Sequence, residues 1–142
     1  MSPEPIVILH AAATWAMVGL IWFVQVVHYP LFAAVGPEGF VAYEAQHTKR
    51  TTWVVAALMP VEVGSALLLT TVDAIPSALS WTGAVLVVAI WIVTLAVQVP
   101  QHRTLGNGFR NATWRSLVRS NWIRTAAWSI RGLLAAAMLA AL

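Results

Sequence analysis

The sequence predicts an all-α fold, an integral membrane bundle of four helices, from three observations. Of the 142 residues, 60% are hydrophobic and only 9% are charged, whereas a soluble domain carries about 25% charged residues. Four apolar stretches are each about 20 residues long, enough for a helix to cross a hydrocarbon core of about 30 Å. The connections between them are short and polar. Residues 1–142 are therefore predicted to form a single domain.

The composition also excludes several classes of protein. A chain this apolar is neither disordered nor an ordinary cytosolic enzyme. There is no cysteine, which excludes disulfides, thiolate metal sites and cysteine nucleophiles. The formal net charge is only +3, and the basic residues gather in two loops. We interpret them as a topology signal and predict no nucleic-acid partner.

The four predicted spans cover residues 6–28, 52–72, 79–99 and 123–142. We do not expect the first span to be a signal peptide, because residues 1–5 hold no Lys or Arg and its apolar run is too long. The helix of the second span is expected to begin before the membrane, with Pro37 as its first residue. The link at 100–120 is predicted to be the longest. No span repeats another, so no duplicated half is predicted.

The positive charges predict the orientation. The loops after the first and third spans hold Lys49, Arg50, Arg103, Arg110, Arg115 and Arg119, whereas the N-terminus and the turn at 73–80 hold no Lys or Arg. The positive-inside rule places both basic loops in the cytoplasm and both termini outside. We expect a multi-pass protein of the bacterial cytoplasmic (inner) membrane, with lipid as a partner. Because four short helices bury little surface, we also consider a homo-oligomer.

Two charged residues lie inside the predicted spans. Glu62 and Arg131 both fall near the midplane, where a charge costs at least about 2.5–3.5 kcal/mol and normally faces the bundle interior. Pro60 removes a helical hydrogen bond nearby, so Pro60 and Glu62 together predict a cavity wall. One interpretation is an ion pair that locks the helices together. In the other interpretation, Glu62, Arg131 and Arg124 are catalytic residues that orient the substrate or move protons.

A second polar cluster is predicted at the cytoplasmic edge. Imidazole and carboxylate are the usual metal ligands in a protein without cysteine. The sequence therefore predicts a site for iron or copper made by His28, Glu44, His47 and His102. Glu44 and His47 are three residues apart and share a helix face, which continues toward Glu62. If no metal binds, no cofactor is expected.

Other ligands remain open for the same cluster. Haem is the main alternative cofactor, held by His28 and His102 or by His10 alone. A quinone or an aromatic substrate is a further candidate ligand. Gln98, Asn121 and Trp128 would suit an aromatic ring that bears oxygen atoms. Taken singly, each histidine also fits a purely structural role.

Short motifs resemble a known family. His28-Tyr29-Pro30 with a following Phe40 and His47, Val99-Pro100, and Asn121-x-x-Arg124-Thr125 resemble the small four-span membrane proteins grouped with the anthrone oxygenases. This resemblance covers most of the chain and implies oxygenation of an aromatic, polyketide-like substrate at the membrane. An early histidine, Tyr29-Pro30 and Met59-Pro60 give a fainter resemblance to the bacterial four-span protoporphyrinogen oxidases.

These observations lead to one functional expectation and two alternatives. We expect a membrane-embedded oxidoreductase or oxygenase that acts on a small apolar or aromatic substrate in a polar pocket, with a metal ion. The first alternative is an accessory protein that binds haem or quinone without catalysis. The second is a structural or transport bundle in which Glu62 and Arg131 only lock the helices.

Overall fold

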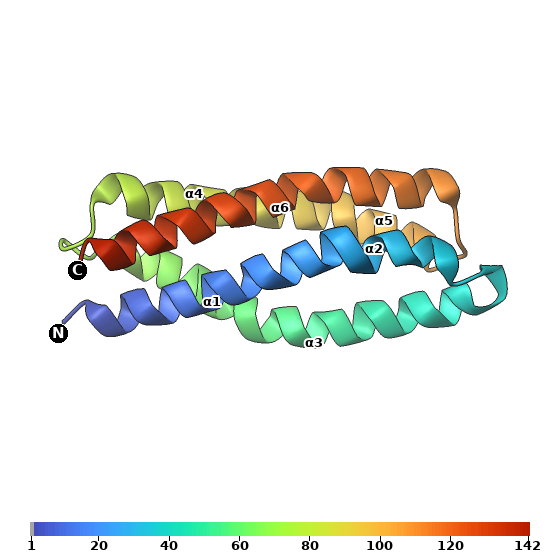
Figure 1. Cartoon of the computed structure of the whole chain (residues 1–142), viewed down its shortest axis with the longest axis horizontal. Helices are drawn as coiled ribbons and strands as arrows, with labels where there is room; N and C mark the ends of the chain where they lie inside the picture. The colour runs from blue at the N-terminus through green and yellow to red at the C-terminus, as the bar shows by residue number, and fades with distance from the viewer. Residues whose placement is uncertain (1) are drawn as a thin grey trace.

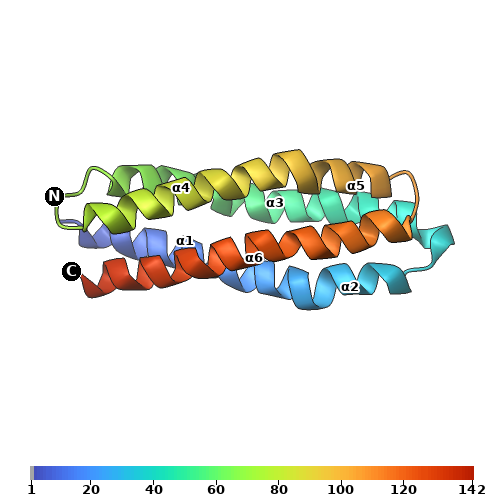
Figure 2. The same cartoon turned by 90° about the horizontal axis from the view of Figure 1, so that it is seen from above.

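The helical elements of the chain join into four long rods, which lie side by side and alternate in direction (Figures 1 and 2). The computed structural model describes residues 2–142, and these residues contain helices and turns but no strand. Both termini lie at the same end of the bundle (Figure 1). The predicted all-α architecture is therefore confirmed.

The first hairpin joins a composite rod to one long helix. The rod consists of α1 (Glu4–Phe23), the π-helix η1 (Val24–His28), α2 (Tyr29–Leu31) and the 3-10 helix η2 (Phe32–Ala34). Gly36 follows with φ of 80°, a left-handed conformation that favours glycine. The return helix α3 (Pro37–Leu69) has 33 residues, which is about 50 Å. Pro37 is its first residue, as predicted.

The second hairpin has the same plan. It contains α4 (Ser77–Val93), the π-helix η3 (Thr94–Gln98), α5 (Val99–Leu105) and α6 (Asn111–Ala140). The long link predicted at 100–120 is wrong, because helix occupies all of it except residues 106–110. The helices extend beyond the apolar spans because the segments that follow the spans also bury apolar side chains. Leu105 and Leu117, for example, are fully buried in one cluster.

The two hairpins are repeats of one arrangement, contrary to the sequence-based prediction. The π-helices η1 and η3 are offset by 70 residues, and each is followed by a proline, Pro30 or Pro100, at the same offset. A proline lacks the N–H that would close the turn and its ring pushes away the carbonyl four residues earlier, so the helix widens locally. The two hairpins resemble each other in these backbone features and not in the order of their apolar side chains. The sequences of the spans therefore do not reveal the repeat.

Three helical segments are long and apolar enough to cross a membrane, namely Glu4–Ala34, Pro37–Leu69 and Ser77–Leu105. The fourth predicted span lies in α6, which is not among these three. Arg124 and Arg131 make α6 more polar than the other long helices. Large apolar side chains nevertheless cover the outside of the bundle, including Trp53, Val85 and Leu133.

The interior alternates between apolar and polar layers along the bundle. An apolar cluster that contains Val7 and Met138 lies near the termini. A middle apolar cluster contains Met17, Ile90 and Trp128. A third, aromatic cluster lies at the opposite end, around Phe32. Buried polar side chains occupy the two intervals, so two polar networks are separated by the middle cluster.

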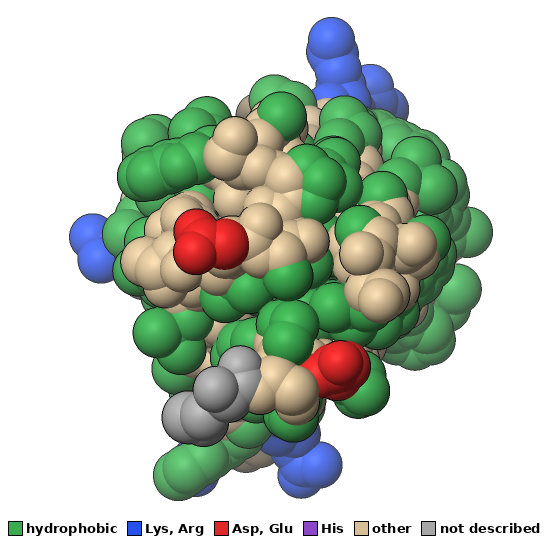
Figure 3. All heavy atoms as spheres, turned by 90° about the vertical axis from the view of Figure 1, so that its left-hand side faces the viewer, with side chains coloured by type: hydrophobic (Ala, Val, Ile, Leu, Met, Phe, Trp, Pro, Cys, Tyr) green, Lys and Arg blue, Asp and Glu red, His purple; other side chains and the backbone are tan. Residues whose placement is uncertain are grey.

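Charge is distributed unequally between the two ends. Glu4 opens α1 and Asp73 lies in the α3–α4 connection, so both are at the end that carries the termini. Figure 3 looks onto this end and shows acidic side chains on its face, whereas basic side chains project from behind the rim. Six basic residues occupy the opposite end: Lys49, Arg50, Arg103, Arg110, Arg115 and Arg119.

Close packing of α1 against α6 depends on Gly132. A Cβ at this position would lie 3.1 Å from Val18 Cγ2 and 3.5 Å from Trp15 Cζ2, so the missing side chain lets the helices approach. We expect Gly132→Leu to destabilise the fold by about 1–3 kcal/mol through overpacking, measured by thermal unfolding in detergent. The control is Gly19→Ala, where a Cβ meets nothing within 4 Å. Equal unfolding temperatures for wild type and Gly132→Leu would contradict this packing.

Candidate functional site

Three side chains from three helical segments form a hydrogen-bonded chain at the basic half of the bundle. His102 on α5 donates from Nδ1 to Glu44 Oε1 on α3 over 2.6 Å, because a carboxylate can only accept. His102 Nε2 is then the acceptor, and the Tyr29 hydroxyl on α2 lies 2.9 Å from it. Glu44 and Tyr29 are buried. This carboxylate–imidazole–phenol chain can move a proton between a buried carboxylate and a hydroxyl.

A second pair of histidines lies beside this chain. His28 Nε2 and His47 Nδ1 are 2.6 Å apart, and Thr51 Oγ1 lies 3.2 Å from the same His47 nitrogen. The rings of His47 and His102 have centroids 5.2 Å apart. All three histidines predicted at this depth therefore meet in one cluster.

The π-helices position several of these groups. Each π turn adds a residue to the helical repeat and so rotates the side chains that follow it. In the first hairpin, η1 ends at His28 and is followed by buried Tyr29. In the second, η3 ends at buried Gln98, four residues before His102. The two prolines thus direct polar side chains inward at the same depth.

A cavity of about 460 Å³ adjoins the cluster, within the size range of small-molecule sites. Its polar wall includes Tyr29, Glu44, His47, Gln98, His102 and Arg124, and its apolar wall includes Val41, Ala45, Val55 and Val99. Three buried atoms in this wall lack a hydrogen-bond partner within residues 2–142: Glu44 Oε2, Gln98 Oε1 and Arg124 Nε. Buried polar atoms are normally satisfied, so these atoms mark a place for a ligand with both donors and acceptors.

Asn121 holds Arg124 rather than lining the cavity. Its amide donates to Gln25 Oε1 over 2.9 Å, and its own oxygen accepts from Arg124 Nη1 over 3.2 Å. Asn121 is completely buried, so it orients the guanidinium from behind. Gln25 is fixed in turn by donating to the Val118 carbonyl over 3.2 Å.

The residues predicted as metal ligands meet, but in two hydrogen-bonded pairs. Within residues 2–142, no group of three or more His, Cys, Asp or Glu side chains is placed to hold a metal ion. The pair predicted for haem does not flank a shared space either, since His28 Nε2 faces His47 and His102 Nε2 faces Tyr29. The four side chains are thus engaged in hydrogen bonds with one another and with Tyr29.

Glu62 and Arg131 form the predicted ion pair, but they belong to a separate network nearer the termini. Arg131 also donates to the Gly83 carbonyl, and Thr14 donates to Glu62. His10, whose role the sequence left open, lies with Nδ1 2.8 Å from Ser65 Oγ in this network. Neither Glu62 nor Arg131 lines the 460 Å³ cavity, so the ion pair fits the structural interpretation.

Two further expectations for this region are wrong. Pro60 is exposed on an unbroken helix, so it does not form a cavity wall. Trp128 is fully buried in the middle apolar cluster, and its ring lies 5.4 Å from the Arg131 guanidinium carbon. It does not line the cavity. The rotation of α3 and α6 about their axes directs Pro60 outward and Trp128 into the apolar core. The order of residue types along the chain does not specify this rotation.

Two site residues were missed by reasoning from the sequence. Tyr29 enters the sequence-based prediction only through the family motifs, and Gln25 is absent from it. Pro30 is the signal that points to Tyr29. A proline within a long apolar helix predicts a local distortion of that helix, which changes the direction of the neighbouring side chains. No comparable signal marks Gln25, whose role depends on α6 lying beside it. Comparison of the chain with protein-family profiles, with curated proteins and with solved structures gives no match.

Proposed function

We propose that this chain is a membrane-embedded oxygenase that uses the Glu44–His102–Tyr29 chain as an acid–base relay on a small aromatic substrate. The observation that supports the proposal is the relay itself, at the wall of a cavity that contains three unpartnered buried polar atoms. The apolar wall suits an aromatic body, and Arg124 suits an oxygen that becomes negative. The resemblance to the anthrone oxygenases favours dioxygen as the oxidant.

The proposed topology places four helices across a bacterial cytoplasmic membrane. Three helical segments are apolar enough by themselves, and α6 would cross with Arg131 neutralised by Glu62. The basic end would face the cytoplasm and both termini would lie outside, as the positive-inside rule predicts. The substrate would reach the cavity near the cytoplasmic surface of the membrane.

The relay supplies a complete reaction for an anthrone. Tyr29 takes a proton from the ring methylene while passing its own proton to His102 Nε2, and Glu44 stabilises the imidazolium. Arg124 stabilises the resulting enolate oxygen. The enolate carbon donates electrons to dioxygen and forms a carbon–oxygen bond, and the peroxide takes the proton back. Loss of water leaves a ketone, so anthrone and dioxygen give anthraquinone and water.

The test is an oxygen-electrode assay on the full chain purified in mild detergent, with anthrone as the probe. We expect one dioxygen consumed for each anthraquinone formed. We expect Arg124→Gln to lower kcat/KM at least tenfold, mainly through kcat, since a hydrogen bond from a charged donor to the developing enolate oxygen contributes about 1.5–3 kcal/mol. Arg110→Gln removes an exposed charge outside the cavity and should leave kcat/KM unchanged. Anthrone binding without oxygen uptake would contradict catalysis and favour the accessory-protein alternative.

Metal content of the same preparation separates the relay from the sequence-based metal prediction. We expect oxygen uptake to persist after dialysis against a chelator, with iron and copper well below one atom per chain by plasma mass spectrometry. Stoichiometric metal whose removal abolishes uptake would contradict the relay as the source of activity. It would instead return His28, Glu44, His47 and His102 to the role of ligands.

A further inference from the structure

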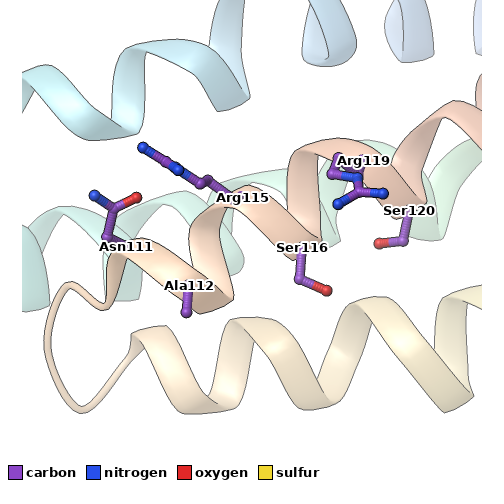
Figure 4. A pocket seen from close by; sticks show the side chains of 6 residues that line it. All are labelled: Asn111, Ala112, Arg115, Ser116, Arg119 and Ser120. Atoms are coloured by element: carbon purple, nitrogen blue, oxygen red, sulfur yellow. The ribbon is translucent and has the colours of Figure 1, made fainter.

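An open groove lies along α6 at the basic end of the bundle, outside the candidate site. It has a volume of about 660 Å³ and is lined by Asn111, Ala112, Arg115, Ser116, Arg119 and Ser120 (Figure 4). Arg115 and Arg119 are exposed and are four residues apart, so they lie one above the other on the same helix face. No ion pair within residues 2–142 involves either arginine. The groove therefore presents two positive charges that the fold itself does not neutralise.

The groove also offers hydrogen-bond donors. Ser116 Oγ accepts from Gln101 Nε2 over 2.8 Å, which leaves its hydroxyl hydrogen free to donate. Asn111 adds an exposed amide at the edge of the groove. Arg115 and Asn111 point to one side of α6 and Ser116 to the other (Figure 4). The donors for a phosphate are therefore the guanidinium groups and the amide, since arginine binds phosphate oxygens through two parallel N–H bonds.

The face that carries the arginines becomes apolar farther along α6. Trp122 follows Arg119 by three residues and is 49% exposed, and Leu133 follows at the same helical angle and is 67% exposed. A spacing of four, three and eleven residues keeps Arg115, Arg119, Trp122 and Leu133 on one face. A polar head over the arginines and an acyl chain along Trp122 and Leu133 would match this sequence of surfaces.

We propose that this groove binds one anionic glycerophospholipid, with the phosphate on Arg115 and Arg119 and an acyl chain along the exposed face of α6. Charge complementarity selects an anionic head over a zwitterionic one, because basic residues near the surface attract anionic lipids. The exposed apolar side chains of Trp122 and Leu133 favour a lipid over free phosphate. This site is independent of the proposed oxygenase activity, because the groove and the cavity share no lining residue.

Native mass spectrometry of the full chain in detergent tests this proposal, with phosphatidylglycerol and phosphatidylcholine as probes. We expect one phosphatidylglycerol per chain, bound at least tenfold more tightly than phosphatidylcholine. Arg115→Gln with Arg119→Gln should weaken phosphatidylglycerol binding about twentyfold. The matched control, Lys49→Gln with Arg110→Gln, removes two exposed charges from the same end outside the groove. It should change binding less than threefold.

Three outcomes would overturn the site. Equal weakening by both double variants would show that only the diffuse charge of this end attracts lipid. Equal binding of the two lipids would show that the head group is not recognised. Displacement of phosphatidylglycerol by millimolar glycerol 3-phosphate would show that the groove takes a soluble phosphate. Circular dichroism of each variant confirms folding, which exposed arginines should not affect.

Discussion

Arg131→Met is expected to destabilise the fold by about 3–5 kcal/mol, because it leaves Glu62 as a buried charge without its partner. Both side chains are at most 1% exposed. Arg131 on α6 also donates to the Gly83 carbonyl on α4, so the substitution removes a contact between these two helices in addition to the ion pair with α3. Thermal unfolding in detergent, followed by helical circular dichroism, measures the effect. Arg119→Met on the same helix, at an exposed position, should change stability by less than about 0.5 kcal/mol.

The double variant separates a structural lock from a functional pair. Replacing Glu62 with Leu and Arg131 with Met removes both charges at similar volume, and such replacements of buried pairs are often neutral or stabilising. We expect the double variant to recover most of the stability lost in Arg131→Met, and to oxidise anthrone at the wild-type rate. A stable double variant without oxygenase activity would show that the pair takes part in the reaction.

Tyr29→Phe is expected to lower the rate of anthrone oxidation by about 10²–10⁴-fold, the usual contribution of a positioned acid or base. The phenol oxygen is one end of the relay and Tyr29 lines the cavity, and phenylalanine keeps the packing of the ring against Phe32. The loss of one hydrogen bond should cost only about 0.5–1.5 kcal/mol of stability. Oxygen uptake and unfolding temperature, measured on the same preparation, distinguish the two effects.

Two comparisons make this prediction specific. Tyr43→Phe alters a half-buried tyrosine on α3 outside the relay and the cavity, so it should retain activity. Glu44→Gln should reduce the rate as well, and combining it with Tyr29→Phe should add little, because residues that act as one unit are not additive. Multiplicative losses in the double variant, or a near-wild-type rate for Tyr29→Phe, would refute the relay.

Several properties could be predicted from the amino-acid order alone. The all-α fold follows from the long apolar stretches, and the start of α3 from Pro37, because these signals are local. The pairing of Glu62 with Arg131 follows from their positions inside apolar spans, since each is a charge in the membrane that needs a neutralising neighbour. The concentration of basic residues at one end of the bundle follows from their place between the apolar stretches, although all six except Arg110 lie on helices.

Other properties were decided only by the tertiary structure. The sequence brought His28, Glu44, His47 and His102 to one depth, but the rotation of each rod determined that they pair with one another and that Tyr29 joins them. The same rotation exposes Pro60 and buries Trp128. Rotation depends on the π turns and on how closely neighbouring helices approach, as at Gly132. These are contacts between distant segments, and a linear pattern of residue types does not specify them.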